Sequence, residues 1–251
     1  MQLKGKSALV TGAGGGICRA IAAAFAAEGA NVMCCDIDEK SAAETARLVE
    51  AAGAKAISRV CDVAREADCI AAADAAKAAF GGLDILVSGA APHDPGGKVH
   101  EIPVAEWRQV LDINLTGSFL LSRAVVPHML AGGGGSIILI ASQLARVGTA
   151  GRAAYCATKG ALVQLAKVMA VDYAAQNIRV NTLSPGAVET ERTLKRYGSF
   201  DAANATLGQK HLTQRLGKVD EIAPAAVFLA SDAASFVTGS DLLVDGGYTA
   251  V

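Results

Sequence analysis

The chain has 251 residues, of which 52% are hydrophobic and 19% charged, and its formal net charge is −1. This length allows one large α/β domain or two small ones, and the near-neutral charge without a dense basic patch argues against nucleic acid as the main partner. No apolar stretch reaches the roughly 20 residues that span a bilayer and the N-terminus leaves no room for a signal peptide, so we expect a cytoplasmic protein with no membrane partner.

Strand-like and helix-like segments alternate along the whole chain. In chain order we predict a strand at Ser7–Thr11, a helix at Ile17–Ala27, a strand at Asn31–Asp36, a helix at Ser41–Ala52, a strand at Ala54–Cys61, a helix at Glu66–Phe80, a strand at Leu83–Ser88, a mostly helical stretch at Pro103–Leu130, a strand at Ser136–Ala141, a helix at Tyr155–Ala175, a strand at Ile178–Leu183, a helix at Val219–Ala230 and a strand at Asp241–Val244. This alternation of near-continuous apolar strands with helices predicts an α/β fold, a doubly wound parallel sheet of about seven strands with helices on both faces.

Two features concern the organisation of the chain. No linker rich in Pro or Ser divides it, so we interpret residues 1–251 as a single domain. The segment Thr190–Leu212 is polar, mixed in charge and follows a strand, which is typical of an insertion over a cleft. We expect it to be a substrate lid.

The six cysteines form no C-x-x-C pair. Cys34 and Cys35 are adjacent in a predicted strand, where side chains point to alternate faces. We therefore expect no metal site and no disulfide framework, and we interpret most of the cysteines as small buried hydrophobes.

A glycine-rich turn joins the first predicted strand to the first helix. It runs Thr11-Gly12-Ala13-Gly14-Gly15-Gly16-Ile17. Glycines allow a tight turn and let backbone N–H groups approach a pyrophosphate, and the helix N-terminus adds a partial positive charge. A flexible loop is the alternative, but the position between strand and helix favours a dinucleotide site at Gly12, Gly15, Gly16 and Ile17.

Asp36 ends the second predicted strand. A carboxylate there can accept hydrogen bonds from both hydroxyls of the adenine ribose and would repel a 2′-phosphate. Ile37 follows, and the glycine loop contains no Arg or Lys before Arg19. These observations favour NAD over NADP, although Asp36 could also be a simple turn residue before a helix.

Tyr155 and Lys159 are four residues apart in a predicted helix, so their side chains share a face. A nearby ammonium can lower the pKa of a phenol from roughly 10 by about 1–3 units, which makes the phenol a usable acid or base near neutral pH. Ser142 lies upstream, at the end of the apolar run Ile137–Ala141. An amphipathic helix whose Tyr and Lys merely share a face is the alternative.

Several motifs in this order resemble the short-chain dehydrogenase/reductase family over nearly the whole chain. They are Thr11-Gly-x-x-x-Gly-Ile17, Asp62-Val63, Asn114, Ser142, Tyr155-x-x-x-Lys159, Asn181-Thr-Leu-Ser-Pro-Gly186, Phe228-Leu-Ala-Ser-Asp232 and Asp245-Gly-Gly247. The resemblance implies a Rossmann-like fold and a homotetramer that uses Asp112–Leu130, Tyr155–Ala175 and the C-terminal strand.

The resemblance also implies a role for each matching residue. Tyr155 would be the general acid/base, and Lys159 would lower its pKa and hold the nicotinamide ribose. Ser142 would hydrogen-bond the reacting oxygen, and Asn114 would support a proton-relay water. The further implied cofactor contacts are Asp62 and Val63 at adenine, Ser88 and Ala90 after the fourth strand, and Val188 and Thr190 at the carboxamide. The alternatives are that Asn114 only kinks a helix and that Ser142 only caps a turn.

The chain departs from the family pattern twice. Cys18 stands where a third glycine is usual, so the geometry of the cofactor loop is expected to change slightly. Ser88-Gly89-Ala90-Ala91 replaces Asn-Asn-Ala-Gly, and Gly89 lacks the side chain that normally ties strands together. We expect either a loss of local rigidity or compensation elsewhere.

The predicted reaction is the reversible oxidation of a secondary alcohol by NAD. The loops expected to form the substrate walls carry His93, Asp94, Gln143, Arg146, Arg152, Arg192, Lys195 and Arg196. This set favours a polar small molecule such as a sugar, polyol or hydroxy acid, unless most of these charges are solvated loop residues. A ketoacyl-thioester reductase of the same family, a methyltransferase and a non-catalytic dinucleotide-binding protein are the competing interpretations, and Asp36 counts against the first because such reductases mostly use NADPH.

Overall fold

A computed structural model describes residues 1–94 and 96–250. Within these ranges, seven parallel strands form one sheet in the order β3-β2-β1-β4-β5-β6-β7. The strands are β1 (Ser7–Thr11), β2 (Asn31–Asp36), β3 (Ala56–Val60), β4 (Ile85–Ser88), β5 (Gly135–Ile140), β6 (Ile178–Pro185) and β7 (Asp241–Val244). The strand order reverses between β1 and β4, which confirms the predicted doubly wound, Rossmann-like fold.

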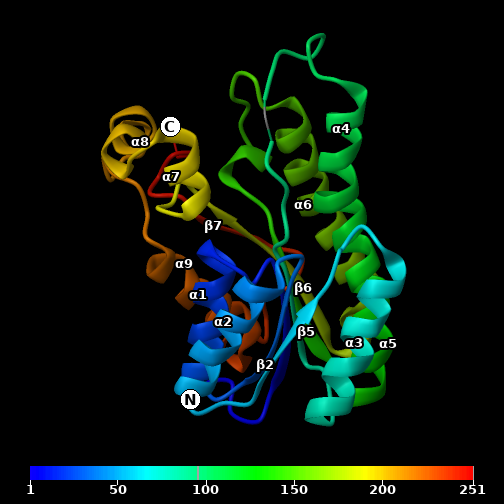
Figure 1. Cartoon of the computed structure of the whole chain (residues 1–251). Coiled ribbons are helices and arrows are strands. Elements are labelled where there is room, and N and C mark those ends of the chain that lie inside the picture. The colour runs from blue at the N-terminus through cyan, green and yellow to red at the C-terminus, as the bar shows by residue number, and fades with distance from the viewer. Residues whose placement is uncertain (95, 251) are drawn as a thin grey trace.

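Helices cover both faces of the sheet (Figure 1). They are α1 (Gly16–Ala27), α2 (Glu39–Ala51), α3 (Glu66–Phe80), α4 (Val104–Leu111), α5 (Gly117–Gly132), α6 (Ala153–Tyr173), α7 (Glu191–Tyr197), α8 (Phe200–Thr206) and α9 (Val219–Ala230). In residues 1–94 and 96–250, none of the helices has the length and apolar character needed to cross a membrane.

The core is divided into two layers by the alternation of side chains along each strand. In β1, Ala8 and Val10 pack into the cluster under α1 and α9, whereas Leu9 packs into the cluster under α3, α5 and α6. All five residues of β1 are buried. Five of the six cysteines are buried, and Cys156 is half-buried, as expected for small hydrophobes.

The predicted helical stretch Pro103–Leu130 contains a change of helix type. Between α4 and α5 the backbone forms a π-helical turn, Asp112–Thr116, in which Gly117 N–H donates to Asp112 O. Such turns are rare and often lie at functional sites. This turn carries Asn114.

The insertion Thr190–Leu212 is largely helical and lies above the carboxyl ends of the strands (Figure 1). Thr190 Oγ1 accepts a hydrogen bond from Thr193 N at 3.3 Å, which caps α7, and Ser199 Oγ accepts one from Ala202 N at 3.1 Å, which caps α8. Gly198, with φ of 80°, ends α7. The sequence therefore encodes a separate pair of short helices over the site.

Candidate active site

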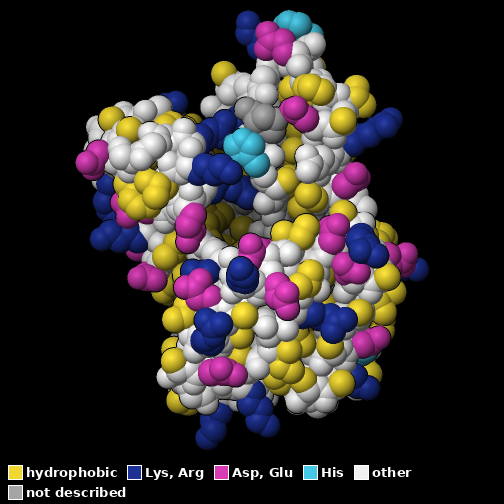
Figure 2. Space-filling model, in the orientation of Figure 1, with side chains coloured by type: hydrophobic (Ala, Val, Ile, Leu, Met, Phe, Trp, Pro, Cys, Tyr) yellow, Lys and Arg dark blue, Asp and Glu magenta, His cyan; other side chains and the backbone are white. Residues whose placement is uncertain are grey.

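A cleft of about 640 Å³ lies at the carboxyl ends of the strands. In Figure 2 it is a hollow with an apolar floor and several Lys and Arg side chains at its rim. Its lining includes most of the predicted site residues: Gly12, Gly15, Gly16, Ile17, Asp36, Asp62, Val63, Ala90, Ser142, Tyr155, Lys159, Val188 and Thr190. Ser88 and Asn114 lie behind the lining, where both are buried.

The glycine loop is shaped by close backbone contacts. Gly12 has φ of 67°, and a Cβ built on it would lie only 2.9 Å from the backbone N of Ala90. No larger residue fits there, because the turns after β1 and β4 touch. The loop therefore offers a backbone cradle next to the N-terminus of α1, which fits the diphosphate of a dinucleotide.

Asp36 fixes the loop with the same carboxylate that was predicted to bind ribose. Gly14 N–H donates to Oδ2 at 2.8 Å and Asp38 N–H donates to Oδ1 at 3.0 Å. Each carboxylate oxygen has a further lone pair for a ligand, so the residue fits the ribose hydroxyls.

Arg19 lies closer to this region than its sequence position indicates. Its Nε donates to Thr45 Oγ1 at 3.0 Å, and its guanidinium also reaches the backbone oxygen of Gly14 and the carboxylate of Glu44. The guanidinium is therefore engaged by groups of the protein itself. Arg19 lies one helical turn after Gly15, and this spacing in the sequence could have predicted its position beside the loop.

The two departures from the family pattern fit each other in space. A Cβ built on Gly89 would collide with Cys18 Sγ. The thiol fills the volume that a side chain at position 89 would take, and burial raises its pKa to about 12, so it is a neutral packing group. Gly89 N–H also donates to Thr11 Oγ1 at 3.2 Å, which ties β4 to β1. The structure thus shows compensation.

Lys159 and Tyr155 come together at the start of α6. Lys159 is 3% exposed, its Nζ donates to Ile140 O at 2.6 Å, and Nζ lies 5.5 Å from the centre of the Tyr155 ring. Burial, with a smaller contribution from the positive charge of Arg192, lowers the pKa of Lys159 to about 7. Both protonation states of the amine are therefore populated near neutral pH.

Ser142 and Asn114 are held by neighbouring polar groups. Ser142 Oγ accepts a hydrogen bond from Leu144 N at 3.2 Å, which leaves its own proton available. Asn114 Nδ2 donates to Thr158 Oγ1 at 3.0 Å, and Thr158 Oγ1 donates to Tyr155 O at 2.9 Å. Asn114 Oδ1 has no donor among the described residues.

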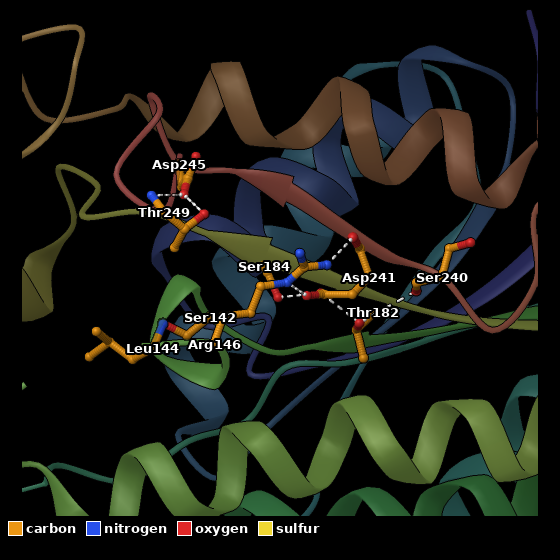
Figure 3. Close-up of polar contacts among 9 residues, drawn as sticks. All are labelled: Ser142, Leu144, Arg146, Thr182, Ser184, Ser240, Asp241, Asp245 and Thr249. Atoms are coloured by element: carbon orange, nitrogen blue, oxygen red, sulfur yellow. Dashed lines mark hydrogen bonds and ion pairs between the residues drawn. The ribbon is translucent and has the colours of Figure 1, made fainter. Parts of the chain in front are cut away.

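The Asp241 carboxylate anchors the turn that carries Ser142 (Figure 3). Thr182 Oγ1 donates to Oδ1 at 2.7 Å, Ser184 Oγ donates to Oδ1 at 2.5 Å, and Arg146 Nε donates to Oδ2 at 2.8 Å. The carboxylate is only 3% exposed. Arg146 therefore ties the turn to β6 and β7, because a charge-assisted bond to a buried partner restricts its motion.

The expectations for the substrate walls are half right. Gln143, Arg152, Arg192 and Arg196 line the cleft, whereas His93, Asp94, Arg146 and Lys195 do not. Arg146 forms an ion pair with Asp241 instead, and its positive charge compensates that buried carboxylate. Asp94 Oδ2 instead lies 2.7 Å from Arg152 Nε in a buried ion pair.

Arg152 also lies on the predicted catalytic tyrosine. Its guanidinium carbon is 4.6 Å from the centre of the Tyr155 ring, a cation–π contact. The ion pair with Asp94 therefore determines where this cation stands against the ring, a pairing that residue types and spacing in the sequence did not indicate.

The insertion brings Glu191 to the glycine loop. A Cβ built on Gly15 would lie 3.4 Å from Glu191 Oε2. Next to it, Arg192 Nη2 donates to Ala91 O at 2.6 Å across the cleft. The insertion therefore brings one anion, Glu191, and three cations, Arg192, Arg196 and Lys210, to the lining of the cleft. Glu191 was not among the predicted residues.

Comparisons with known proteins agree with this geometry. The family model described as enoyl-(acyl carrier protein) reductase matches residues 12–249. A D-threitol dehydrogenase from Mycolicibacterium smegmatis is 44% identical over 99% of this chain and 94% of its own length.

Solved structures share the whole fold. A short-chain alcohol dehydrogenase structure from Sinorhizobium meliloti has a TM-score of 0.94 and 36% identity, covering 99% of this chain and 98% of its own. A structure named as an NAD(P)-dependent gluconate 5-dehydrogenase, from Beutenbergia cavernae with bound NADP at low occupancy, has a TM-score of 0.92 and 37% identity, covering 100% and 99%.

The fold and cleft thus define an oxidoreductase that uses a nicotinamide dinucleotide and acts on CH–OH groups of small-molecule alcohols. The chain belongs to the short-chain dehydrogenase/reductase family.

Proposed function

We propose that the protein interconverts a secondary alcohol and a ketone on a polar small molecule, with NAD as its cofactor. The observation that carries the cofactor choice is the Asp36 carboxylate at the end of β2, which contacts Gly14 N at 2.8 Å. A dianionic 2′-phosphate placed there would meet a fixed negative charge. The donors of Arg19, the nearest cation along the loop, are shared among Gly14, Thr45 and Glu44.

The cofactor residues are those that line the cleft from the glycine loop to the insertion. Gly12, Gly15, Gly16 and Ile17 would hold the diphosphate, Asp36 the adenine ribose, and Asp62 and Val63 the adenine, with Ala90, Val188 and Thr190 toward the nicotinamide. When bound, the nicotinamide supplies the acceptor for the hydride. Ser88 would act from behind this layer, because its Oγ donates to Ser118 Oγ at 3.0 Å.

Side chains of the protein would carry out the proton transfer. In the oxidation direction the Tyr155 phenolate accepts the proton from the substrate hydroxyl, and in the reduction direction the phenol returns it. The free hydroxyl proton of Ser142 is donated to the same substrate oxygen, which fixes its position. The Lys159 ammonium lies close enough to stabilise the phenolate, and the open acceptor of Asn114 supports a contact with a relay water.

A cofactor-specific dehydrogenase screen tests the proposal. Reduced-cofactor absorbance is followed over secondary alcohols, polyols and sugar acids with NAD and with NADP. We expect kcat/KM with NAD to exceed that with NADP by at least about tenfold. An acetoacetyl thioester reduced with NADPH in preference to all alcohols would instead support the thioester reductase.

Two variants test why the cofactor is selected. Asp36→Ser removes the negative charge and should lower the NAD to NADP ratio of kcat/KM by at least about tenfold. In the Asp36→Ser and Arg19→Ala double variant, the gain with NADP should be kept, because the Arg19 guanidinium is engaged by Thr45, Gly14 and Glu44. An unchanged ratio in Asp36→Ser would contradict the assignment of this carboxylate.

We also propose that residues 190–212 act as a lid and that the protein assembles as a homotetramer. Arg192 already bridges from the insertion to Ala91 across the cleft. Apolar side chains on α5 and α6 are exposed, namely Phe119 at 49%, Val168 at 51% and Val171 at 83%, which supports burial against another subunit. Light scattering after size-exclusion chromatography measures the assembly, and a monomer would contradict it.

A further inference from the structure

One buried polar side chain in the cleft has no partner in the protein. Gln143 follows Ser142, begins the 3₁₀ turn Gln143–Ala145 and is 6% exposed. Among the residues that the structure describes, no donor reaches its Oε1. A buried acceptor without a donor costs about 1–3 kcal/mol. Gln143 Oε1 therefore requires a hydrogen-bond donor from a bound molecule.

His211 lies on the same side of Gly186 as Gln143 but makes no hydrogen bond to Oε1. A Cβ built on Gly186 would lie 3.0 Å from Gln143 Oε1 and 2.8 Å from His211 Nε2, so both side chains converge on this glycine. Ala187 N–H donates to His211 Nε2 at 3.2 Å, and His211 Nδ1 lies 2.9 Å from Leu207 O. Both ring nitrogens are therefore occupied by backbone groups, and neither is directed at Gln143 as a donor.

Gln143 lies beside the residue that would hold the reacting oxygen. Ser142 and Gln143 are consecutive, so their Cα atoms are about 3.8 Å apart, and both line the same cleft as Tyr155 and Gly186. Their turn is tied down through Arg146 and Asp241. The amide is thus preorganised next to the serine that would hold the reacting oxygen.

We propose that the substrate is a vicinal diol or polyol, and that Gln143 binds the hydroxyl on the carbon adjacent to the one oxidised. Oε1 accepts the hydrogen bond of that second hydroxyl while Ser142 and Tyr155 engage the first. This inference rests on the proposed alcohol oxidation. It goes beyond a generally polar substrate, because it specifies two adjacent hydroxyls and the residue that distinguishes them from one.

Matched substrate pairs test the inference with the full-length enzyme and the preferred cofactor. The pairs are each stereoisomer of 2,3-butanediol against 2-butanol, and cyclohexane-1,2-diol against cyclohexanol. We expect kcat/KM for the better diol isomer to exceed that of its monoalcohol by at least about tenfold. Gln143→Met, which keeps the length and removes the amide, should reduce this ratio by about tenfold, because the diol loses the hydrogen bond and the monoalcohol does not.

Two further variants complete the design. Gln143→Glu keeps an acceptor and should retain a diol preference above that of Gln143→Met. Gln176→Met changes an exposed glutamine far along the chain and should leave the ratio unchanged. Equal activity on diols and monoalcohols in the wild type, or equal losses on both in Gln143→Met, would overturn the inference while leaving alcohol oxidation intact. Failure to oxidise any alcohol would overturn the proposed function and this inference together.

Discussion

The cofactor side and the substrate side of the cleft differ in how their polar groups are satisfied. On the cofactor side, both Asp36 oxygens accept backbone N–H groups, and Gly12 packs against the Ala90 backbone. On the substrate side, Gln143 and Asn114 keep acceptors with no donor among the described residues. The polar groups on the cofactor side have hydrogen-bond partners within the protein, whereas the acceptors on the substrate side need donors from a bound molecule. We therefore expect substitutions that abolish turnover to leave cofactor binding largely intact.

The largest expected effect is on the proton-transfer residue. Tyr155→Phe should lower kcat by about 10²–10⁴-fold, because the variant has no group to move the proton. The dissociation constant for NAD, measured by protein fluorescence, should change less than about threefold, since most cofactor contacts come from the glycine loop and Asp36. Near-normal turnover in this variant would contradict the assigned role.

Packing beneath the cofactor loop gives the next effect. Gly89→Ala should lower the free energy of unfolding by about 1–3 kcal/mol through overpacking against Cys18. In the Cys18→Ala background the same change should cost at least about 1 kcal/mol less, which urea titration of all four proteins measures as a coupling energy. Gly132→Ala, where a Cβ meets nothing within 4 Å, is the control. Additive effects at positions 18 and 89 would show that the two departures are unrelated.

The buried amine gives a pH-dependent stability. Burial lowers the pKa of Lys159 from 10.5 to about 7, so between these values the unfolded chain binds more protons and stability rises with pH. Lys159→Met lacks this dependence. Its advantage in the free energy of unfolding over the wild type should be greatest below pH 7 and should be about 1–2 kcal/mol smaller at pH 9 than at pH 7. Parallel urea curves with a constant difference at both pH values would show that the amine is not neutralised by folding.

The smallest effect concerns the one anion that the insertion places beside the glycine loop. Glu191→Gln should tighten NAD binding by about twofold to fivefold, because a partly exposed charge near the diphosphate contributes at most about 1 kcal/mol. Raising the salt concentration should reduce the difference. Glu50→Gln, an exposed change on α2, provides the control. Weaker binding in Glu191→Gln would mean that the carboxylate moves away from the diphosphate on binding and makes a favourable contact.

The sequence predicted the sheet and the residues that line the glycine-loop end of the cleft, because both depend on local patterns. The apolar runs fix β1, β2 and β5, and the carboxyl ends of parallel strands meet at one edge, which brings Gly12, Asp36 and Ser142 together. The lining of the cleft by Tyr155 and Lys159 follows from their spacing in α6. Their chemical roles stay predictions until turnover is measured.

The substrate side was harder to predict because its residues are paired across long stretches of chain. Asp94 was assigned to the cleft wall, but it neutralises Arg152, 58 positions later in the sequence. Arg146 was assigned to the cleft wall as well, but it forms an ion pair with Asp241. Charged residues in loops follow no periodic pattern in the sequence. The orientation of such a side chain depends on which opposite charge the fold brings near it. The compensation between Cys18 and Gly89 was foreseen only as a possibility for the same reason.

The π turn at Asp112–Thr116 sets the phase of the helix that follows it. An α-helix advances about 100° per residue, and a π turn holds one residue more than an α turn, so α5 is rotated by about that angle relative to α4. Leu121, Val125 and Met129 are all fully buried in α5. The length of this short segment, rather than the identity of its side chains, therefore decides which face of α5 meets the sheet while Asn114 stays at the site.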